Sequence, residues 1–326
     1  MSGIAFIMEN SDFSSENIGT IELGSAIENI VDRYISSAGG SASTYRAALL
    51  RMVTSLKQEN IWDGIDIYPM VGNNLTINLN PTDGKVKANL VYDTDHATMG
   101  NNMFTFDGNG PGASSNVTNM SGEYIILPTD STRANLYVCA DVELNENAQT
   151  PGIPKNSRFI YGQRGTGNIK FFTASCSTWG DGSTSPIVLL LDASGGTGKN
   201  RAAYDPSENR LQRRLYSFSI IDIDETIDET NYTSETILRV NGSKVTPDNS
   251  LGGFKTTAKN GSYKLSQNNG IGFMESQAGA TGIDGYYTLD GKVRFFARGI
   301  LSQENALKAD NIFKTFLEST KPYTNS

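Results

Sequence analysis

The chain has little histidine and cysteine, the residues from which metal sites and disulfide frameworks are built. Its 326 residues include one histidine, His96, and two cysteines, Cys139 and Cys176. Two cysteines so far apart are too few for a disulfide framework or a thiolate metal site. One histidine excludes any metal site with two histidine ligands. Both cysteines lie among apolar or small residues, so we expect buried, free thiols.

Long hydrophobic runs are also missing. The sequence has no stretch of about 18 or more uncharged apolar residues that could span a bilayer. The first ten residues have no basic region, and Glu9 interrupts their apolar run, so they do not have the pattern of a signal peptide. The sequence therefore predicts a protein that is neither secreted nor inserted into a membrane.

Positive charge is in deficit. The chain has 27 Lys and Arg residues against 35 Asp and Glu residues, which gives a formal net charge of −8. Such a chain repels phosphate backbones unless a local basic patch overrides the net charge. The densest basic cluster, formed by Arg210, Arg213 and Arg214, leads directly into a strand-like run. We interpret this cluster as a solvated loop end and do not expect nucleic acid as a partner.

Helical periodicity is present near both ends of the chain. After an extended segment, residues 4–23, an amphipathic helix is predicted from Ser25 to the glycine pair 39–40, and a second from Ser43 to about Asn60. A last helix is predicted to begin near Ser302. Its apolar side needs a partner, either the outside of a sandwich or the N-terminal helices. The residues on that side are Ala306, Ala309, Ile312, Phe313, Phe316 and Leu317.

Between the helices, short alternating runs are separated by glycine, asparagine, proline and aspartate. Many such strands at short intervals indicate a sandwich or a barrel. Asn241-Gly242 predicts a hairpin turn, and residues 93–121 are interpreted as a long loop or a set of short turns. The predicted strands are residues 75–79, 124–127, 136–144, 158–161, 169–174, 187–191, 215–223, 236–240, 270–274 and 292–298.

The predicted fold class is mainly β, an antiparallel jelly-roll sandwich with N-terminal helices and a C-terminal helix packed on it. Residues 1–72 would form an extended segment and two helices for docking, residues 73–300 the sandwich, and residues 301–326 the C-terminal helix and tail. In the strand at 215–223, Tyr216, Phe218 and Ile220 alternate with Ser217 and other residues, so one face should be more apolar.

Two pairs of carboxylates are the candidates for glycoside hydrolysis. Asp222 with Asp224, and Asp141 with Glu143, each place two carboxylates on one face of a predicted strand. Neither reproduces the signature of jelly-roll glucanases, which resembles Glu-x-Asp-x-x-Glu or Glu-x-Asp-x-Glu. We interpret both pairs as solvent-facing strand surface and predict no catalytic residue, with a polysaccharide-degrading enzyme as the alternative.

Nucleotide and metal binding receive less support. The run 194–200 resembles the end of a phosphate-binding loop but has Asn200 where serine or threonine is required, so a hairpin or loop connection is expected. His96 is interpreted as part of a polar turn. No cofactor is predicted, with structural calcium as an open alternative. The carboxylates considered for calcium are Asp93, Asp95, Asp107, Asp181 and Asp284, none of which has EF-hand spacing.

Loop aromatics are the candidates for sugar binding, because an apolar sugar face stacks on a ring. Trp179 with the nearby Asp181, and Tyr286 with Tyr287, are the candidate glycan-binding residues. The aromatic residues could equally belong to the core or its rim.

One C-terminal and one N-terminal part of the chain resemble bacteriophage virion proteins with a concanavalin-like, laminin-G-like jelly-roll domain. Asn-Gly-Ile-Gly-Phe-Met at 269–274 and Gly-Tyr-Tyr-Thr-Leu-Asp-Gly-Lys-Val-Arg-Phe-Phe-Ala-Arg-Gly-Ile-Leu-Ser-Gln-Glu-Asn-Ala at 285–306 resemble the closing strand and helix start of such domains. Residues 48–72 resemble the preceding helix with its Trp-Asp-x-Ile and Tyr-Pro-hydrophobic-Val-Gly motifs. Ile61 stands where leucine is usual, and the middle of the chain carries no matching motif.

The resemblance implies a structural component of a phage particle: a tail, fibre, appendage or capsid-decoration protein made in the bacterial cytoplasm. The expected partners are other virion proteins, copies of this chain in an oligomer, and surface carbohydrate of the host. No family binding residue can be matched to this sequence. A jelly-roll glycoside hydrolase and a soluble lectin are the alternative functions.

Overall fold

The computed structural model describes the following parts of the chain. The main chain is described for residues 15–80, 90–92, 97–107, 118–120, 136–144, 158–164, 171–176, 187–192, 199–204, 212–220, 236–244, 268–271, 273–275, 286–288, 290–299 and 301–321. Side chains are described for residues 24–80, 98–106, 137–143, 212–219, 237–244, 291–299 and 301–321.

The first sheet has eight strands, all paired antiparallel. Its order is β13-β12-β11-β6-β17-β4-β3, and β1 also pairs with β17. The long strand β17 pairs with β6 along one edge, whereas β4 and β1 share its other edge. The strands are β1 (Ile65–Tyr68), β3 (Ala97–Gly100), β4 (Met103–Asp107), β6 (Leu136–Leu144), β11 (Arg214–Ile220), β12 (Thr236–Val240), β13 (Ser243–Lys244) and β17 (Asp290–Gly299).

The second sheet has seven strands in the order β10-β9-β8-β7-β14-β5-β2, and its described pairings are antiparallel too. A separate two-stranded sheet joins β15 to β16. The strands are β2 (Leu90–Tyr92), β5 (Thr118–Met120), β7 (Arg158–Arg164), β8 (Phe171–Cys176), β9 (Ile187–Asp192), β10 (Lys199–Tyr204), β14 (Asn268–Ile271), β15 (Phe273–Glu275) and β16 (Tyr286–Thr288).

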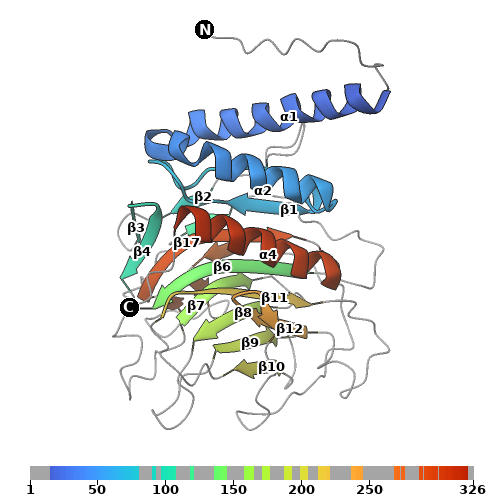
Figure 1. The fold of residues 1–326 in the computed structure, drawn as a ribbon. Helices are drawn as coiled ribbons and strands as arrows, with labels where there is room; N and C mark the ends of the chain where they lie inside the picture. The colour runs from blue at the N-terminus through green and yellow to red at the C-terminus, as the bar shows by residue number, and fades with distance from the viewer. Residues whose placement is uncertain are drawn as a thin grey trace.

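A layer of helices covers the side of the first sheet that faces away from the second (Figure 1). The layer contains α1 (Ser15–Ala38), the 3-10 helix η1 (Gly40–Tyr45), α2 (Arg46–Gln58), the 3-10 helix η2 (Trp62–Gly64) and α4 (Gln303–Thr320). Helix α4 packs on α2 and against β11, and α1 packs on α2. The predicted mainly β, antiparallel sandwich with helices from both ends packed on it is therefore confirmed. None of the described helices is long and apolar enough to cross a membrane.

The main hydrophobic cluster lies between this helical layer and the first sheet. Val31, Leu49 and Phe313 from the three helices meet Tyr137 on β6 and Phe295 on β17, all essentially without exposed surface. Phe295 stacks at a tilt on Phe313, with 4.7 Å between ring centroids. Burial of so much apolar surface is the main term that holds the layer on the sheet.

Most predicted elements of the first sheet are confirmed. Alternation placed β6 at its observed bounds, and the predicted hairpin forms between β12 and β13 around Asn241 and Gly242, whose φ angles are 52° and 81°. Helix α4 begins after Ser302, whose hydroxyl accepts a hydrogen bond from the main-chain N–H of Asn305 (3.2 Å). In the second sheet, β9 pairs with β10 and Asp192 lies opposite Lys199, whereas the glycine-rich run 194–198 between them lies outside the described residues.

Three predictions for the first 121 residues were wrong. Residues 15–23, expected to be extended, belong to α1, because no proline interrupts the helix before the amphipathic stretch that begins at 24. Residues 75–79 form no strand. Instead, the Leu79 N–H donates to Ile67 O (2.8 Å) and the Asn78 side chain accepts from Ile67 N–H (3.1 Å). The main-chain groups of Ile67 on β1 are therefore hydrogen-bonded although 75–79 is not a strand. Residues 93–121, expected to be loop or turns, contain β3, β4 and β5.

One face of strand β11 was predicted to be more apolar than the other. In the structure, both faces are buried. Ser217 and Ser219 have 1% and 0% exposed surface, because α4 and the chain around it cover their side of the sheet. Tyr216 and Phe218 are buried on the other side. Buried hydroxyl groups need hydrogen-bond partners, and those partners are charged.

Candidate functional site

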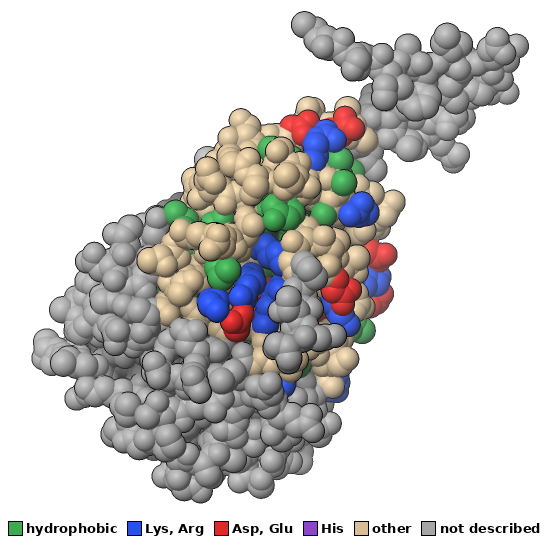
Figure 2. All heavy atoms as spheres, turned by 60° about the vertical axis from the view of Figure 1, so that its left-hand side comes forward, with side chains coloured by type: hydrophobic (Ala, Val, Ile, Leu, Met, Phe, Trp, Pro, Cys, Tyr) green, Lys and Arg blue, Asp and Glu red, His purple; other side chains and the backbone are tan. Residues whose placement is uncertain are grey.

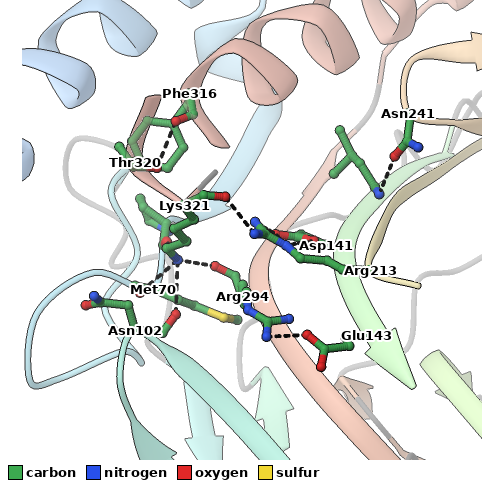
Figure 3. A network of polar contacts seen from close by, with 12 residues as sticks. Met70, Asn102, Asp141, Glu143, Arg213, Asn241, Arg294, Phe316, Thr320 and Lys321 are labelled. Atoms are coloured by element: carbon green, nitrogen blue, oxygen red, sulfur yellow. Dashed lines mark hydrogen bonds and ion pairs between the residues drawn. The ribbon is translucent and has the colours of Figure 1, made fainter. Parts of the chain in front are cut away.

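The carboxylates of β6 lie on the same face of the sheet as α4. Asp141 has no exposed surface, and its two oxygens accept three hydrogen bonds from Arg213, two of 2.9 Å from Nε and one from Nη2 (Figure 3). The side chain of Arg213 is 12% exposed. The interpretation of Asp141 as solvent-facing and of Arg213 as a solvated loop end is therefore wrong, because the chain around the end of α4 covers both.

Glu143, two positions further along β6, is bound by two cations. It accepts a hydrogen bond of 2.8 Å from Lys292 Nζ and another from Arg294 Nη2. Partial burial opposes ionisation of this carboxylate, but the hydrogen bond from Lys292 and the charge of Arg294 outweigh it, so the pKa of Glu143 lies below its ordinary value. A carboxylate that is held ionised is a poor general acid, and Asp141 is fully engaged by a guanidinium. The geometry at this pair favours a structural role.

The end of α4 is held by an unusual contact of Lys321. Its Nζ is within hydrogen-bond distance of four main-chain carbonyl oxygens, which share its three N–H groups: Pro69 O (2.8 Å), Met70 O (3.0 Å), Asn102 O (3.1 Å) and Arg294 O (Figure 3). We call these four oxygens the carbonyl cage. Lys321 is 8% exposed. The cage joins the chain after β1, the turn between β3 and β4, and β17, so one side chain connects three parts of the sequence to α4.

The two networks are continuous. The main-chain oxygen of Lys321 accepts a hydrogen bond of 2.6 Å from Arg213 Nη1, so Arg213 connects the cage residue to Asp141. Together they contain four cationic side chains and two carboxylates. Three of the cations pair with the carboxylates of β6, and the most exposed of them is Lys292, at 32%. Lys and Arg side chains also gather in the middle of the face shown in Figure 2, beside fewer acidic ones. This region is cationic in a chain whose net charge is −8.

A second buried network lies beneath the middle of α4. Asp310, with no exposed surface, accepts hydrogen bonds from Tyr137 Oη (2.7 Å), from Ser217 Oγ (2.6 Å) and from Arg239 Nε. Arg239 Nη1 donates to Ser219 Oγ (3.0 Å), whereas its buried Nη2 has no hydrogen-bond partner among the described residues. Buried charges are tolerated only when they are paired, and this pair fixes α4 against β11 and β12.

Cys139 lies beside this network and is buried and free, as predicted. Burial raises the pKa of the Cys139 thiol well above its ordinary value, and the charge of Asp310 adds to the shift. The same two causes, burial first, raise the pKa of the Tyr137 hydroxyl. A thiol held protonated is a poor nucleophile, so this network is structural.

A groove of about 490 Å³ runs between α2 and α4 on the outside of the helical layer. Its walls include Leu50 and Arg51 from α2 and Ile312 and Phe316 from α4. Its lining is mostly apolar, which is typical of surfaces that pack against another chain or a ligand.

The predicted glycan site is only partly covered by the described residues. Tyr286 and Tyr287 lie on β16, opposite Glu275 and Met274 of β15. Trp179 and Asp181 lie outside the described residues, as does the pair Asp222 and Asp224.

The residues considered for calcium are also largely outside the described part of the chain. Asp107 ends β4, whereas His96, Asp93, Asp95, Asp181 and Asp284 are not described. Among the residues whose placement is described, no group of three or more His, Cys, Asp or Glu side chains could hold a metal ion.

Sequence reasoning did not identify Lys321, Asp310 or Arg239. A signal for Asp310 was available, because it occupies a position of the apolar stripe of α4, four residues after Ala306. A charged residue in such a stripe indicates a buried partner. No comparable signal marks Lys321, because main-chain carbonyls leave no trace in the sequence.

Comparison with known proteins gives only distant likenesses. No protein-family model matches the chain, and no curated protein matches it. The solved structures it resembles include the binding domain of botulinum neurotoxin serotype G (11% identity, TM-score 0.45, 77% of this chain and 50% of that one). Others are Trypanosoma rangeli sialidase in complex with sialic acid (11%, 0.42, 85% and 39%) and the binding domain of Paraclostridial Mosquitocidal Protein 1 (11%, 0.40, 77% and 52%). The chain spans about half or less of these proteins, and likeness at this level carries no inference about what it binds.

Proposed function

We propose that this chain is a structural component of a bacteriophage particle, in which the sandwich is a rigid body and the helical layer contacts neighbouring subunits. One observation carries the proposal. The two segments that resemble virion proteins, 48–72 and 285–306, are distant in sequence but adjacent in space: β1 pairs with β17 from Ile65 opposite Gly299 to Tyr68 opposite Phe296, and α2 packs on α4. Chance matches to two separate motifs have no reason to form one unit.

The contact between these segments includes a buried ion pair. Arg298 Nε on β17 donates to Asp66 on β1 (3.3 Å), and Asn78 also donates to Asp66 (3.0 Å). Arg298 and Asp66 are 4% and 2% exposed. A buried pair of this kind specifies one pairing of the two strands. This supports the proposal that both segments belong to one structural unit on which the sandwich is presented.

The state of the described carboxylates supports a role without catalysis. Asp141 and Glu143 are bound by arginine and lysine side chains, which leaves no free acid and base facing a common space. The remaining enzyme candidate is the pair Asp222 and Asp224. Incubation of the chain with host capsule or cell-wall polysaccharide should release no new reducing ends, and release that Asp224→Asn abolishes would establish the enzyme alternative.

The decisive experiment is to locate the chain in assembled particles. Particles purified by density gradient from a lysate should contain it at a fixed copy number, measured by quantitative mass spectrometry, and reconstruction should contain density for the sandwich. Particles of a mutant phage whose copy of the gene carries an early stop codon are the control and should be defective in assembly or attachment. A chain that sediments only with free protein, beside intact particles, would contradict the proposal.

We further propose surface glycans of the host as a second partner, bound through Trp179, Asp181, Tyr286 and Tyr287. Aromatic rings next to glycine and aspartate supply the stacking surface and hydrogen-bond acceptor that sugars require. Saturable binding on a glycan array that falls at least tenfold in Trp179→Ala is the expected result. The conservative Trp179→Phe should retain part of the binding, and equal loss in both variants would point to misfolding.

A further inference from the structure

The carbonyl cage around Lys321 is built where the chain departs from regular structure. Met70 and Asn102 have φ angles of 55° and 57°, in the left-handed region that non-glycine residues rarely adopt. Arg294 is at a register shift of β17, where Val293 is opposite Val142 but Phe295 is opposite Asp141. A bulged residue has no partner in the ladder, so its carbonyl is free to accept another donor.

Contacts that do not involve Lys321 hold the cage in shape. The side chain of Asn102 accepts a hydrogen bond from Gly72 N–H (2.9 Å) and donates to the Tyr45 hydroxyl (3.0 Å). Gly72 has a φ of 102°, and a Cβ added to it would lie 2.6 Å from Gly39 O, so the close approach that positions this loop requires glycine. Strained backbone persists only where its surroundings determine it, which indicates a preformed site.

The chemistry of the cage suits a cation, and the group that fills it here is an ammonium. All four of its groups are acceptors, and an ammonium has three N–H donors and no lone pair, whereas a neutral amine would direct its lone pair at a carbonyl oxygen. Burial lowers the pKa of Lys321; the charge of Asp141 opposes this shift, and those of Arg213 and Arg294 add to it. The carbonyl dipoles act in the opposite direction to burial, because they stabilise the charged form.

We infer that the carbonyl cage is a binding site for a primary ammonium group, which Lys321 fills from within the chain. When Lys321 occupies the carbonyl cage, its contacts attach the end of α4 to the turn between β3 and β4 and to β17. The contact of Lys321 O with Arg213 adds the β11 end of the sheet to the same fastening. Closure of the helical layer by Lys321 goes beyond the proposed function and does not depend on it.

The test is chemical rescue of the full-length Lys321→Ala protein. Removing the side chain leaves four acceptors without a donor, so Tm should fall by about 5 °C or more. Methylammonium chloride should raise the Tm of the variant in a saturable manner and slow amide exchange at the end of α4. Tetramethylammonium chloride at the same ionic strength should not, because this cation carries no N–H group. The wild-type protein should not respond to methylammonium.

Two further variants make the result specific. Lys321→Met keeps most of the side-chain volume without the donors, so it should be destabilised but not rescued, because the cage is occupied. Lys308→Met removes an exposed lysine of the same helix, which is 38% exposed and bound to Glu59 and Glu304, and should be neither strongly destabilised nor rescued.

If Lys321→Ala does not fold, the yield of refolding from urea with methylammonium replaces Tm, with tetramethylammonium as the reference. Equal responses to methylammonium and tetramethylammonium, or a wild-type Tm in Lys321→Ala, would overturn the inference. Because the readout is the stability of the isolated chain, either result is independent of whether the chain is found in phage particles.

Discussion

Helices α4 and α1 belong to the same layer but are attached in different ways. Both have an apolar stripe, represented by Phe313 on α4 and Val31 on α1, each with 0% exposure. Helix α4 in addition buries Asp310 in its middle and is followed by the buried Lys321. On α1, by contrast, the charged side chain of Asp32 is 54% exposed. An apolar stripe decides which face a helix buries, whereas directional polar contacts decide its position along the sheet.

The difference indicates separate roles for the two helices. Helix α4 is part of the rigid body, since its register is determined by bonds to three strands. Helix α1 lies outermost, across α2, and its N-terminal end extends past α2 (Figure 1). The C-terminal end of α1 is fixed by Ala38 O, which accepts hydrogen bonds from Asn73 N–H (3.0 Å) and Asn74 N–H (2.9 Å), whereas the rest of the helix is held mostly by apolar contacts. Such contacts allow small shifts at low cost, so the N-terminal part of α1 is the better candidate for contacting a neighbouring subunit.

The largest effect is expected at Asp310. Asp310→Ala leaves the guanidinium of Arg239 buried without its carboxylate, and removing one partner of a buried pair costs about 3–5 kcal/mol. Urea unfolding should show this loss in the free energy of unfolding. Asn311→Ala, at the exposed neighbouring position, is the matched control and should change it by less than about 0.5 kcal/mol. A loss in Asp310→Ala no larger than in the control would mean that apolar packing alone positions α4.

A smaller effect is expected in the stripe of α1. Ile27 is 5% exposed, and Ile27→Ala removes buried apolar surface near the outer end of the described stripe, at a cost of about 2 kcal/mol. Exposed Ser36→Ala on the same helix is the control. Hydrogen exchange should increase in α1 while α4 stays protected. Equal increases in both helices would show that the layer opens as one unit and that the comparison between them is wrong.

Periodicity predicted the elements of the fold well but not its polar contacts. Alternating residues gave β6 and β17, and the apolar positions of 302–317 gave α4, because these patterns report burial directly. At residues 75–79 the alternation of Leu75, Ile77 and Leu79 was read as a strand, although the Asn78 side chain, not a ladder, bonds to β1. Apolar alternation reports a buried extended segment, and it does not report which groups satisfy the backbone.

The candidate site was beyond sequence reasoning because its partners are distant in the chain and partly main chain. Tyr137 and Asp310 are 173 positions apart, and Lys321 reaches Pro69 across 252. The carboxylates of β6 were noticed for their spacing, but the cations that neutralise them are supplied by β17 and by Arg213. Spacing within one strand predicts a shared face, whereas the state of a carboxylate depends on what the fold brings to that face.

A modest effect is expected at the side-chain hydrogen bond that joins α1 to the chain after β1. The Tyr34 hydroxyl donates to Val71 O over 3.4 Å, and Tyr34 is 2% exposed. Burial raises the pKa of this hydroxyl, so it remains a donor throughout the physiological range. Because the bond is long, Tyr34→Phe should cost about 0.5 kcal/mol, at the low end for a hydrogen bond. A loss above that of Ile27→Ala would show that α1, like α4, is positioned by a polar contact.

The smallest effect is expected at the ion pair between α1 and α2. Arg46 donates to Asp32 through Nε (2.7 Å) and Nη2 (3.1 Å), and this hydrogen bond lowers the pKa of the Asp32 carboxyl. The side chains are 41% and 54% exposed, so Asp32→Asn should cost only about 0.3 kcal/mol, and less as salt rises from about 0.1 M to 1 M. A carboxyl whose pKa is lower in the folded state stabilises the fold at pH values above its pKa in the unfolded state. This contribution is lost as the pH falls through its pKa in the folded state. The difference in Tm between wild type and Asp32→Asn should therefore vanish in acid, and a difference that persists there would assign Asp32 a role in packing rather than in charge.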